Sequence, residues 1–410
     1  MTKRQTSKNS KNQGTSIGAL IVVAIALVMV IISEITGVDL LAPVTETPPP
    51  TVLELTPGQP TGTEIAGVSG TVSAVSLPFG VGAIKDFWQV YFTLPSGSSD
   101  LTTYSGGIDV ALASALAGVK NTLDIAAYEF NNPLITQAVL DAKARGVRVR
   151  VVTDNEDGLE DVSTTLDQLV EAGIPVVTDE RAALMHNKFM ILDGETVWTG
   201  SWNYTINGTY RNNNNALVLR SQRAVQNYQT EFDEMFAEGL FGPSSRANTP
   251  YASFVQNGVP IQIYFGPEDD VLTAIHDTLL QAQSSIHFMA FSFTLDELAS
   301  AILQRAVDGV SVRGIFERVG SETQFSELRP LFCAGLDVRQ DGNPYILHHK
   351  VFIVDEETVV TGSFNFSANA TNSNDENLVI IQDADLAAQY LAEFERRWLE
   401  AVEPANVTCS

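Results

Sequence analysis

Two stretches of the chain repeat one pattern of histidine, lysine, aspartate, glycine, serine and asparagine. The first runs from His186 to Asn203 and the second from His348 to Asn365. Both follow H-x-K-x4-D-x6-G-S-x-N, so every polar residue of one copy has a counterpart in the other. A single H-x-K is common by chance, whereas two complete copies with the same internal spacing indicate a duplicated site.

The two lysines and the residues of the Gly-Ser turns suit an oxyanion. Lys188 and Lys350 are point charges for phosphate oxygens. Four neutral side chains are expected to donate directional hydrogen bonds to the same oxygens. They are Ser201, Asn203, Ser363 and Asn365. If the two copies converge, this set predicts a site that stabilises a pentacoordinate phosphorane without a metal ion.

The two histidines supply a nucleophile and a proton donor. One of His186 and His348 is expected to attack phosphorus and form a phosphohistidine, while the other protonates the leaving oxygen and then activates water. The expected substrate is a phosphodiester, because its leaving group needs a proton. The sequence contains no Cys/His cluster or carboxylate-rich loop that suggests a metal, so we expect no cofactor.

The segments around each copy alternate between strand patterns and helix patterns in the same order. The apolar runs 189–192 and 351–354 within the copies predict short buried strands. The expected helices span 110–120, 134–145, 162–172 and 224–238 in the first half, and 271–283, 295–308, 327–334 and 384–398 in the second. This order predicts an α/β fold of two duplicated mixed-sheet α/β/α lobes about a pseudo-two-fold axis.

These residues resemble the two-motif phosphodiesterases of the phospholipase D superfamily. The resemblance implies that each lobe contributes one motif to a single cleft. It implies a mainly structural role for Asp193 and Asp355, which would bond nearby backbone, and Gly200 and Gly362 close the pattern as turn residues. His349 follows the second motif histidine on the opposite face of its strand, so we expect it to pack or to support the site from behind.

The resemblance also indicates a partner for each motif histidine. Asn214 follows His186 at the same distance at which Glu376 follows His348, and in the family a residue at this place orients the imidazole. We therefore expect Asn214 to pair with His186 and Glu376 with His348. Because a carboxylate stabilises imidazolium and an amide has little charge bias, this predicts His186 as the nucleophile and His348 as the acid and then the base. The family usually places the nucleophile in the first half.

The N-terminal part of the chain differs from the rest in composition. An uncharged apolar run preceded by basic residues predicts a membrane anchor, with the N-terminus cytoplasmic and the catalytic part extracytoplasmic. A cleaved signal peptide is the alternative, but no A-x-A site follows the run. The expected divisions are a basic tail at 1–16, an anchor at 17–36, a Pro/Thr/Gly-rich linker at 37–85, and lobes at 86–245 and 246–405. Within the linker, residues 68–83 could also form an edge strand.

Charge and cysteine content bear on the substrate and the compartment. The net charge is −25, and four of the basic residues precede the predicted anchor, so the remainder is strongly acidic. An acidic protein repels polyanions, which disfavours nucleic acid. Cys333 and Cys409 could form a disulfide in an exported protein, or Cys333 could be a buried free thiol. The sequence leaves both alternatives open.

Three functions are compatible with these observations. We expect a phospholipase D acting on glycerophospholipid headgroups, because the anchor would hold the domain near a bilayer. A nuclease of the same superfamily is the alternative, and a catalytically silent scaffold is a third that the intact motifs disfavour. A phosphatidyl-transferring synthase is a subsidiary option. Both motifs lie in one chain, so we expect a monomer.

Overall fold

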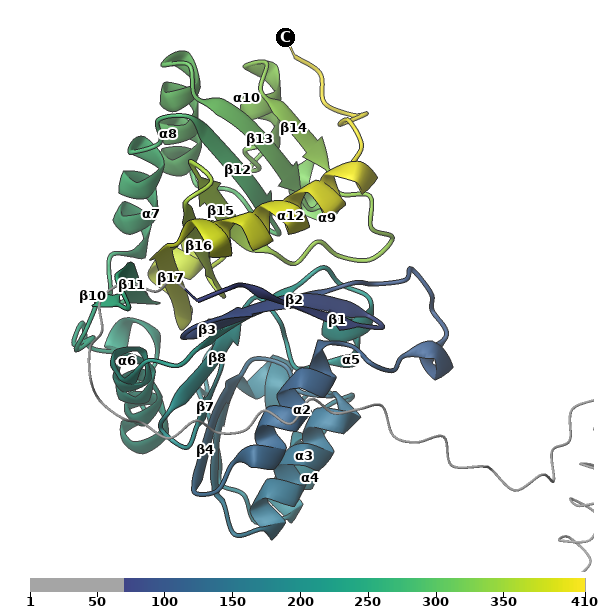
Figure 1. The fold of residues 1–410 in the computed structure, drawn as a ribbon, viewed down its shortest axis with the longest axis vertical. Helices are drawn as coiled ribbons and strands as arrows, with labels where there is room; N and C mark the ends of the chain where they lie inside the picture. The colour runs from purple at the N-terminus through teal and green to yellow at the C-terminus, as the bar shows by residue number, and fades with distance from the viewer. Residues whose placement is uncertain (1–69, 410) are drawn as a thin grey trace, which may run out of the picture. The chain divides into compact units, whose positions relative to one another are not determined.

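Two β-sheets organise residues 70–409, the part of the chain that the structure, a computed structural model, describes (Figure 1). The strand order is β1-β2-β3-β9-β8-β7-β4-β5-β6 in the first sheet and β10-β11-β17-β16-β15-β12-β13-β14 in the second. In each sheet three neighbouring strands pair in parallel and the others pair antiparallel. The α/β fold with two duplicated mixed sheets is therefore confirmed.

The strands follow the order expected from the sequence, with three additional strands at the sheet edges. The first sheet contains β1 (Ser73–Leu77), β2 (Gly80–Lys85), β3 (Trp88–Thr93), β4 (Thr122–Ala127), β5 (Arg148–Thr153), β6 (Val176–Thr178), β7 (Lys188–Leu192), β8 (Thr196–Gly200) and β9 (Asn215–Leu219). The second contains β10 (Ser253–Gln256), β11 (Val259–Gly266), β12 (Ser285–Ala290), β13 (Ser311–Phe316), β14 (Asp337–Gln340), β15 (Lys350–Val354), β16 (Thr358–Gly362) and β17 (Glu376–Gln382).

Every helix expected within the two lobes is present, with ends shifted by a few residues. The helices of the first lobe are η1 (Leu101–Thr103), α2 (Ile108–Gly118), α3 (Pro133–Ala144), η2 (Asn155–Leu159), α4 (Leu166–Glu171), α5 (Ile206–Tyr210), α6 (Gln222–Asp233), η3 (Glu234–Glu238) and η4 (Gly242–Ser244). Those of the second are α7 (Val271–Leu280), α8 (Asp296–Val307), α9 (Arg318–Ser321), α10 (Leu328–Cys333), α11 (Ala368–Asn372) and α12 (Ala384–Glu400).

The motif strands are buried on both faces, which explains their uninterrupted apolar sequence. Phe189 and Ile191 of β7 face one hydrophobic core, whereas Met190 and Leu192 face another, because successive side chains of a strand point to opposite faces. The strand β15 repeats this division of its side chains. Each motif strand is thus held from both sides, and the lysine at its first position is fixed with it.

The two lobes share the core that lies between their sheets. Helix α6 contacts β7 and β8 of its own lobe and β11 of the other, and α12 contacts β15 and β16 of its own lobe and β3 of the other. Tyr228, Phe232, Tyr390 and Phe394 from these helices belong to one cluster of buried side chains. Figure 1 shows α12 running between the two sheets. The lobes therefore bury each other's inner faces, and the two motif strands are packed into a common core.

The N-terminal expectations are met in part. The predicted tail and anchor lie outside the described residues, as does most of the linker. Residues 73–85, placed in the linker, instead form the hairpin β1–β2, which extends the first sheet beyond β3. The edge-strand alternative is therefore right for this stretch. Val75 and Leu77 of β1 pack against the hydrophobic core of the first lobe. Among residues 70–409, no helix is long and apolar enough to span a membrane.

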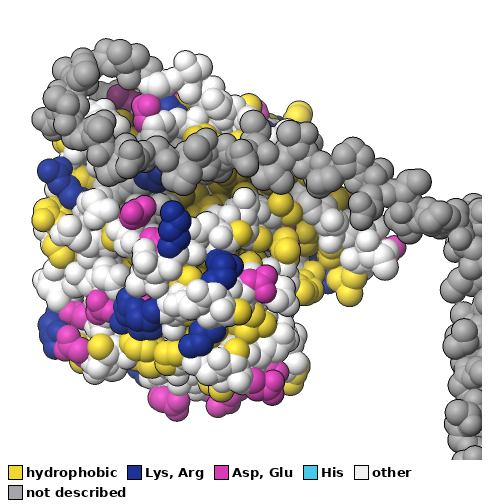
Figure 2. Space-filling view, turned by 60° about the horizontal axis from the view of Figure 1, so that its bottom comes forward, with side chains coloured by type: hydrophobic (Ala, Val, Ile, Leu, Met, Phe, Trp, Pro, Cys, Tyr) yellow, Lys and Arg dark blue, Asp and Glu magenta, His cyan; other side chains and the backbone are white. Residues whose placement is uncertain are grey.

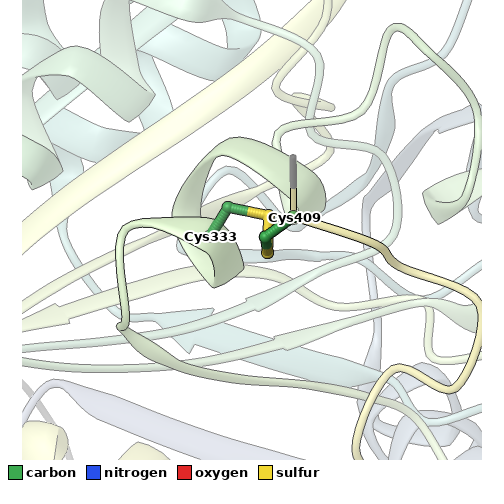
Figure 3. Close-up of a disulfide and its surroundings, with 2 residues drawn as sticks. All are labelled: Cys333 and Cys409. Atoms are coloured by element: carbon green, nitrogen blue, oxygen red, sulfur yellow. A yellow bond between two sulfur atoms is a disulfide. The ribbon is translucent and has the colours of Figure 1, made fainter.

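A disulfide joins Cys333, at the end of α10, to Cys409 (Figure 3). The sequence left the pairing open, and the structure shows it. The bond attaches the segment after α12 to the outer helices of the second lobe. Closing a loop of this length restricts the unfolded chain, an effect worth about 4 kcal/mol in the chain-entropy account.

Two carboxyl groups approach each other where the lobes meet behind the motif strands. Glu231 of α6 and Glu268, which follows β11, interact through their side chains. Burial, followed by Glu268, raises the pKa of Glu231 well above its ordinary value, and burial raises the pKa of Glu268 to about 8. Asp375, Asp269 and Glu234 add negative charge around the pair. The pair must therefore hold a proton that the same residues lose in the unfolded chain.

Glu268→Gln is expected to raise the melting temperature by a few °C at pH 8.5 and to change it little at pH 5. A raised pKa in the folded state gives stability that is present below the unfolded pKa of about 4.3 and is lost as pH rises through about 8. Glutamine resembles the protonated carboxyl at every pH. Calorimetric unfolding from pH 5 to 9 measures the difference, with Glu171→Gln on the exposed face of α4 as control. A parallel shift of the whole pH profile would contradict the explanation.

Candidate active site

Each motif begins by pairing with the opposite lobe. The backbone N–H of His186 donates to the carbonyl of Asp375 at 3.0 Å, and that of His348 donates to the carbonyl of Asn213 at 2.9 Å. These carbonyls belong to the residues just before β17 and β9 respectively, the last strands of the two lobes. The segment before the last strand of each lobe therefore pairs with the motif of the other lobe, and the two histidines lie in one buried cluster.

The histidine partners are consequently exchanged relative to the expectation from the sequence. Nδ1 of His186 lies 2.9 Å from both carboxylate oxygens of Glu376, and Nδ1 of His348 lies 3.0 Å from Oδ1 of Asn214. The predicted pairs, His186 with Asn214 and His348 with Glu376, are wrong. The register along the sequence is correct, but Asn214, just before β9, and Glu376, the first residue of β17, each contact the motif histidine of the other lobe.

The environment of His348 fixes its tautomer. Asn214 donates from Nδ2 to the carbonyl of Gly208 at 2.9 Å, so its Oδ1 faces the imidazole as an acceptor. The carbonyl of Ser201 also lies 3.0 Å from Nδ1 of His348. Two acceptors at Nδ1 require a proton there, which leaves Nε2 with its lone pair. The carboxylate at Nδ1 of His186 imposes the same arrangement on the other ring.

The two motif serines support the histidine partners rather than phosphate. The hydroxyl of Ser201 donates to Oδ1 of Asn214 at 2.9 Å, and that of Ser363 donates to Oε2 of Glu376 at 2.6 Å. Each Oγ also accepts a backbone N–H from the following strand. A hydroxyl has only one hydrogen to donate, so the expectation that these serines donate to phosphate is wrong.

Both motif lysines are buried and lie on aromatic rings. Nζ of Lys188 lies 4.8 Å from the ring centre of Tyr128, and Nζ of Lys350 lies 4.8 Å from that of Phe291. Each ammonium also donates to the carbonyl of its own motif histidine. Burial lowers the pKa of Lys188 to about 7, against the charges of Glu376 and Glu129, and burial lowers that of Lys350 well below its ordinary value. An anionic ligand would restore the charge of both.

The charges of the cluster act on both imidazoles. Burial, followed by Lys188 and Lys350, lowers the pKa of His186 well below its ordinary value. Burial, followed by the same two lysines and then His186, does so for His348. Burial raises the pKa of Glu376 to about 7, against the charge of Lys188. The site therefore contains two neutral imidazoles beside the lysines Lys188 and Lys350, an arrangement suited to binding an anion.

The motif asparagines border the same cluster. Asn203 is 8% exposed, and its Nδ2 donates to Oε2 of Glu129 at 2.6 Å, which leaves one N–H for another acceptor. The Oδ1 atoms of Asn203 and Asn365 have no hydrogen-bond partner. The roles of Glu129, Tyr128 and Phe291 were not expected from the sequence. Their position at the end of β4 or β12, the strands beside the motif strands, was the available signal.

The motif aspartates and glycines hold the backbone. Asp193 accepts backbone N–H groups from Lys120, Asn121 and Thr122, and Asp355 accepts the equivalent bonds in the other lobe. Both carboxylates thus tie the end of the motif strand to the start of the neighbouring strand. Gly200 has a φ of +132°, and a Cβ there would lie 2.5 Å from the carbonyl of Asn215. Gly362 has the same constraint.

His349 supports the site from behind, in agreement with its expected place. Its Nδ1 lies 3.1 Å from Nδ2 of Asn215, and its Nε2 lies 3.2 Å from a carboxylate oxygen of Glu393. In the other lobe, Asn187 occupies the same motif position and accepts from Asn377 at 2.8 Å. These paired contacts cross between the lobes and fix the two motif strands relative to each other. Among residues 70–409, no group of three or more His, Cys, Asp or Glu side chains could hold a metal ion.

Comparisons with known proteins match both halves of the chain to one family model. The family model described as "Cardiolipin synthase, PLD-like domain" matches residues 112–236 and 275–398, together more than half of the chain. A mitochondrial cardiolipin hydrolase of Xenopus tropicalis is 39% identical over 31% of this chain and 60% of its own length. A phospholipase D of Rickettsia felis is 36% identical over 32% of this chain and 66% of its own length. The chain thus spans less than two thirds of either relative.

A solved structure resembles both lobes together. The phosphatidylserine synthase of Haemophilus influenzae superimposes with a TM-score of 0.56, at 16% identity, over 72% of this chain and 85% of that one. At this identity the likeness concerns the fold alone. It covers the arrangement of two duplicated sheets in one chain.

Lys188→Met is expected to lower kcat/KM by about 10²- to 10³-fold and to raise the melting temperature. The activity falls because a charge that stabilises the transition state is removed, an effect of about 3–4 kcal/mol. The stability rises because an ammonium no longer has to be buried. This gain should be largest below pH 7 and shrink toward pH 10.5, the interval between the folded and ordinary pKa.

Hydrolysis of bis(p-nitrophenyl) phosphate and calorimetric unfolding at pH 6 and 9 measure both effects. Lys120→Met, at an exposed lysine, is the matched control. A fall in melting temperature together with activity would show that Lys188 holds the fold instead.

Proposed function

Because the chain belongs to the phospholipase D superfamily, we propose that it is a metal-independent phosphodiesterase that hydrolyses the headgroup ester of glycerophospholipids. The observation that carries the proposal is the exchange of histidine partners across the lobes. Each partner fixes the tautomer of one imidazole and leaves its Nε2 free to react. Both imidazoles lie in the same cluster as two buried lysines. A nucleophile, a proton donor and anion-binding charges are what phosphodiester cleavage requires.

In the proposed mechanism His186 is the nucleophile. Its Nε2 attacks phosphorus, forming the N–P bond as the bond from phosphorus to the headgroup oxygen breaks. The ring then carries positive charge for the lifetime of the intermediate, and the carboxylate of Glu376 compensates it. The carboxylate also makes the imidazole a stronger nucleophile. His186 thus keeps the role predicted from the sequence, although the reason has changed with its partner.

His348 is the proton donor in this mechanism. The bound phosphate offsets the charges of Lys188 and Lys350, so His348 can hold a proton at Nε2 and pass it to the headgroup oxygen. The neutral amide of Asn214 does not stabilise the imidazolium, which therefore remains a strong acid. In the second step His348 takes a proton from water, the water oxygen attacks phosphorus, and the N–P bond breaks to release phosphatidic acid.

Charge and compartment support a lipid over a nucleic acid. The net charge is −25, and Figure 2 shows basic side chains interspersed with acidic and hydrophobic ones on the face it presents. Non-specific nucleic-acid binding depends on a continuous basic surface. The disulfide between Cys333 and Cys409 favours an oxidising compartment, as the predicted extracytoplasmic location requires. The named relatives, a cardiolipin hydrolase and a phospholipase D, also act on lipids by their names.

The wild-type chain is expected to release headgroup from phosphatidylcholine micelles in the presence of EDTA, at the same rate as without it. No step of the mechanism uses a metal. Choline release and plasmid nicking should be measured in parallel at equal enzyme concentration. Nicking without choline release would assign the chain to the nucleases of the superfamily. Loss of turnover in EDTA that Ca²⁺ or Zn²⁺ restores would refute the metal-free mechanism.

His348→Ala is expected to release one equivalent of nitrophenol from a p-nitrophenyl phosphodiester and then to accumulate phosphoenzyme. Nitrophenolate is a good leaving group that needs no acid, so only the second step should stop. His186→Ala should give neither a burst nor phosphoenzyme. Rapid-quench kinetics with a ³²P-labelled substrate measure both. The opposite pattern would make His348 the nucleophile.

A further inference from the structure

The two lobes differ at one charged position beside their motif asparagines. Tyr128-Glu129-Phe130 follows β4, and Phe291-Ser292-Phe293 follows β12. Phe130 forms a bridge with Tyr204, and Phe293 forms the equivalent bridge with Phe366, in each case the residue after the motif asparagine. The two segments are therefore in the same register. Glu129 occupies in the first lobe the place that Ser292 occupies in the second.

Glu129 is in direct contact with the phosphate-facing groups. Its Oε2 accepts from Nδ2 of Asn203 at 2.6 Å. Burial raises the pKa of Glu129, and the charge of Lys188 counteracts that rise. Asn203 is more than nine-tenths buried, and its Oδ1 has no partner. Asp157, which accepts from the hydroxyl of Tyr128 at 2.6 Å, adds a second negative charge to the same side. The first-lobe wall of the site is therefore anionic immediately beside its anion-binding groups.

The motif itself does not require a carboxylate at this position. Ser292 supplies only its backbone carbonyl, which accepts the N–H of Phe366, and the second-lobe motif keeps the same backbone course. The turn that carries the motif asparagine therefore forms without a carboxylate at this position, so the presence of Glu129 needs another explanation. A carboxylate that partly offsets Lys188 weakens the attraction of the site for anions, an effect that a serine would not have.

We propose that Glu129 is a specificity-determining residue that excludes substrates carrying a second phosphate beside the scissile one. The preferred class is an isolated phosphodiester whose neighbouring groups are neutral or cationic, such as phosphatidylcholine. Cardiolipin and polynucleotides are disfavoured, because their adjacent phosphate would meet the charges of Glu129 and Asp157 at short range. This inference rests on the proposed function for its lipid substrate, but the exclusion applies to any phosphodiester.

Two substitutions separate charge from hydrogen bonding. Glu129→Gln retains an acceptor for Asn203 and removes the charge, and Glu129→Ser copies the second lobe. Glu160→Gln, at an exposed carboxylate in the same loop region as Asp157, is the matched control. The kcat/KM values for phosphatidylcholine and cardiolipin are measured in the same mixed micelles, at 0.05 M and 0.5 M NaCl. A second substrate pair is bis(p-nitrophenyl) phosphate and a fluorogenic oligothymidylate.

Both Glu129 variants are expected to raise the ratio of cardiolipin to phosphatidylcholine turnover about tenfold at low salt, and less at high salt because of screening. The ratio of oligothymidylate to bis(p-nitrophenyl) phosphate should rise likewise, and Glu160→Gln should change neither. Equal losses on all substrates, with unchanged ratios, would show that Glu129 only positions Asn203. If wild type cleaves no lipid, the proposed lipid function fails, and the second pair still decides the role of Glu129.

Discussion

A buried imidazole needs a polar partner at the nitrogen that does not react, and here each partner comes from the opposite lobe. His186 depends on Glu376, and His348 on Asn214, with contacts of 2.9 and 3.0 Å. Neither lobe alone supplies the Nδ1 partner of its own motif histidine. The shared core, with the helices α6 and α12, and the pairing of the segments before β9 and β17 with the opposite motifs keep both contacts in place.

This dependence explains why so many polar groups are tolerated in the interior. Lys188, Lys350, Glu376, His186 and His348 are all buried, and burial disfavours the charged form of each. Hydrogen bonds reduce this cost: Ser363 donates to Glu376, and each lysine donates to the carbonyl of its own motif histidine. Ser201 donates to Asn214, the partner of His348. The serines, which suggested phosphate ligands by their place in the motif, are instead the supports that hold the histidine partners in position. Preorganised polar groups of this kind contribute to catalysis because they need not reorganise during the reaction.

Sequence alone predicted the elements better than their mutual contacts. Hydrophobic periodicity located β7, β15 and the helices, because each buries one face or two in a hydrophobic core. The equal spacing in the sequence linked Asn214 to His186, but contact depends on the fold, and the segment before β9 pairs with the motif of the other lobe. Glu129 was missed because a carboxylate after a strand has many uses, and only its contact with Asn203 indicates one. The β1–β2 hairpin was ambiguous because its Gly- and Ser-rich sequence also suits a linker.

Duplication supplies two equal halves, whereas in the proposed two-step mechanism the two histidines have different roles. The residues that hold the backbone are equivalent in the two lobes. Asp193 and Asp355 accept equivalent hydrogen bonds, and Ser201 and Ser363 donate equivalent ones. Gly200 and Gly362 both have a positive φ. The lobes diverge where charge matters to the chemistry, at Asn214 against Glu376 and at Glu129 against Ser292. A carboxylate on one imidazole and an amide on the other give the two rings different basicities without altering their geometry. Single substitutions at such positions are therefore sufficient to convert a symmetric anion site into one with distinct roles, because the backbone that positions them is unchanged.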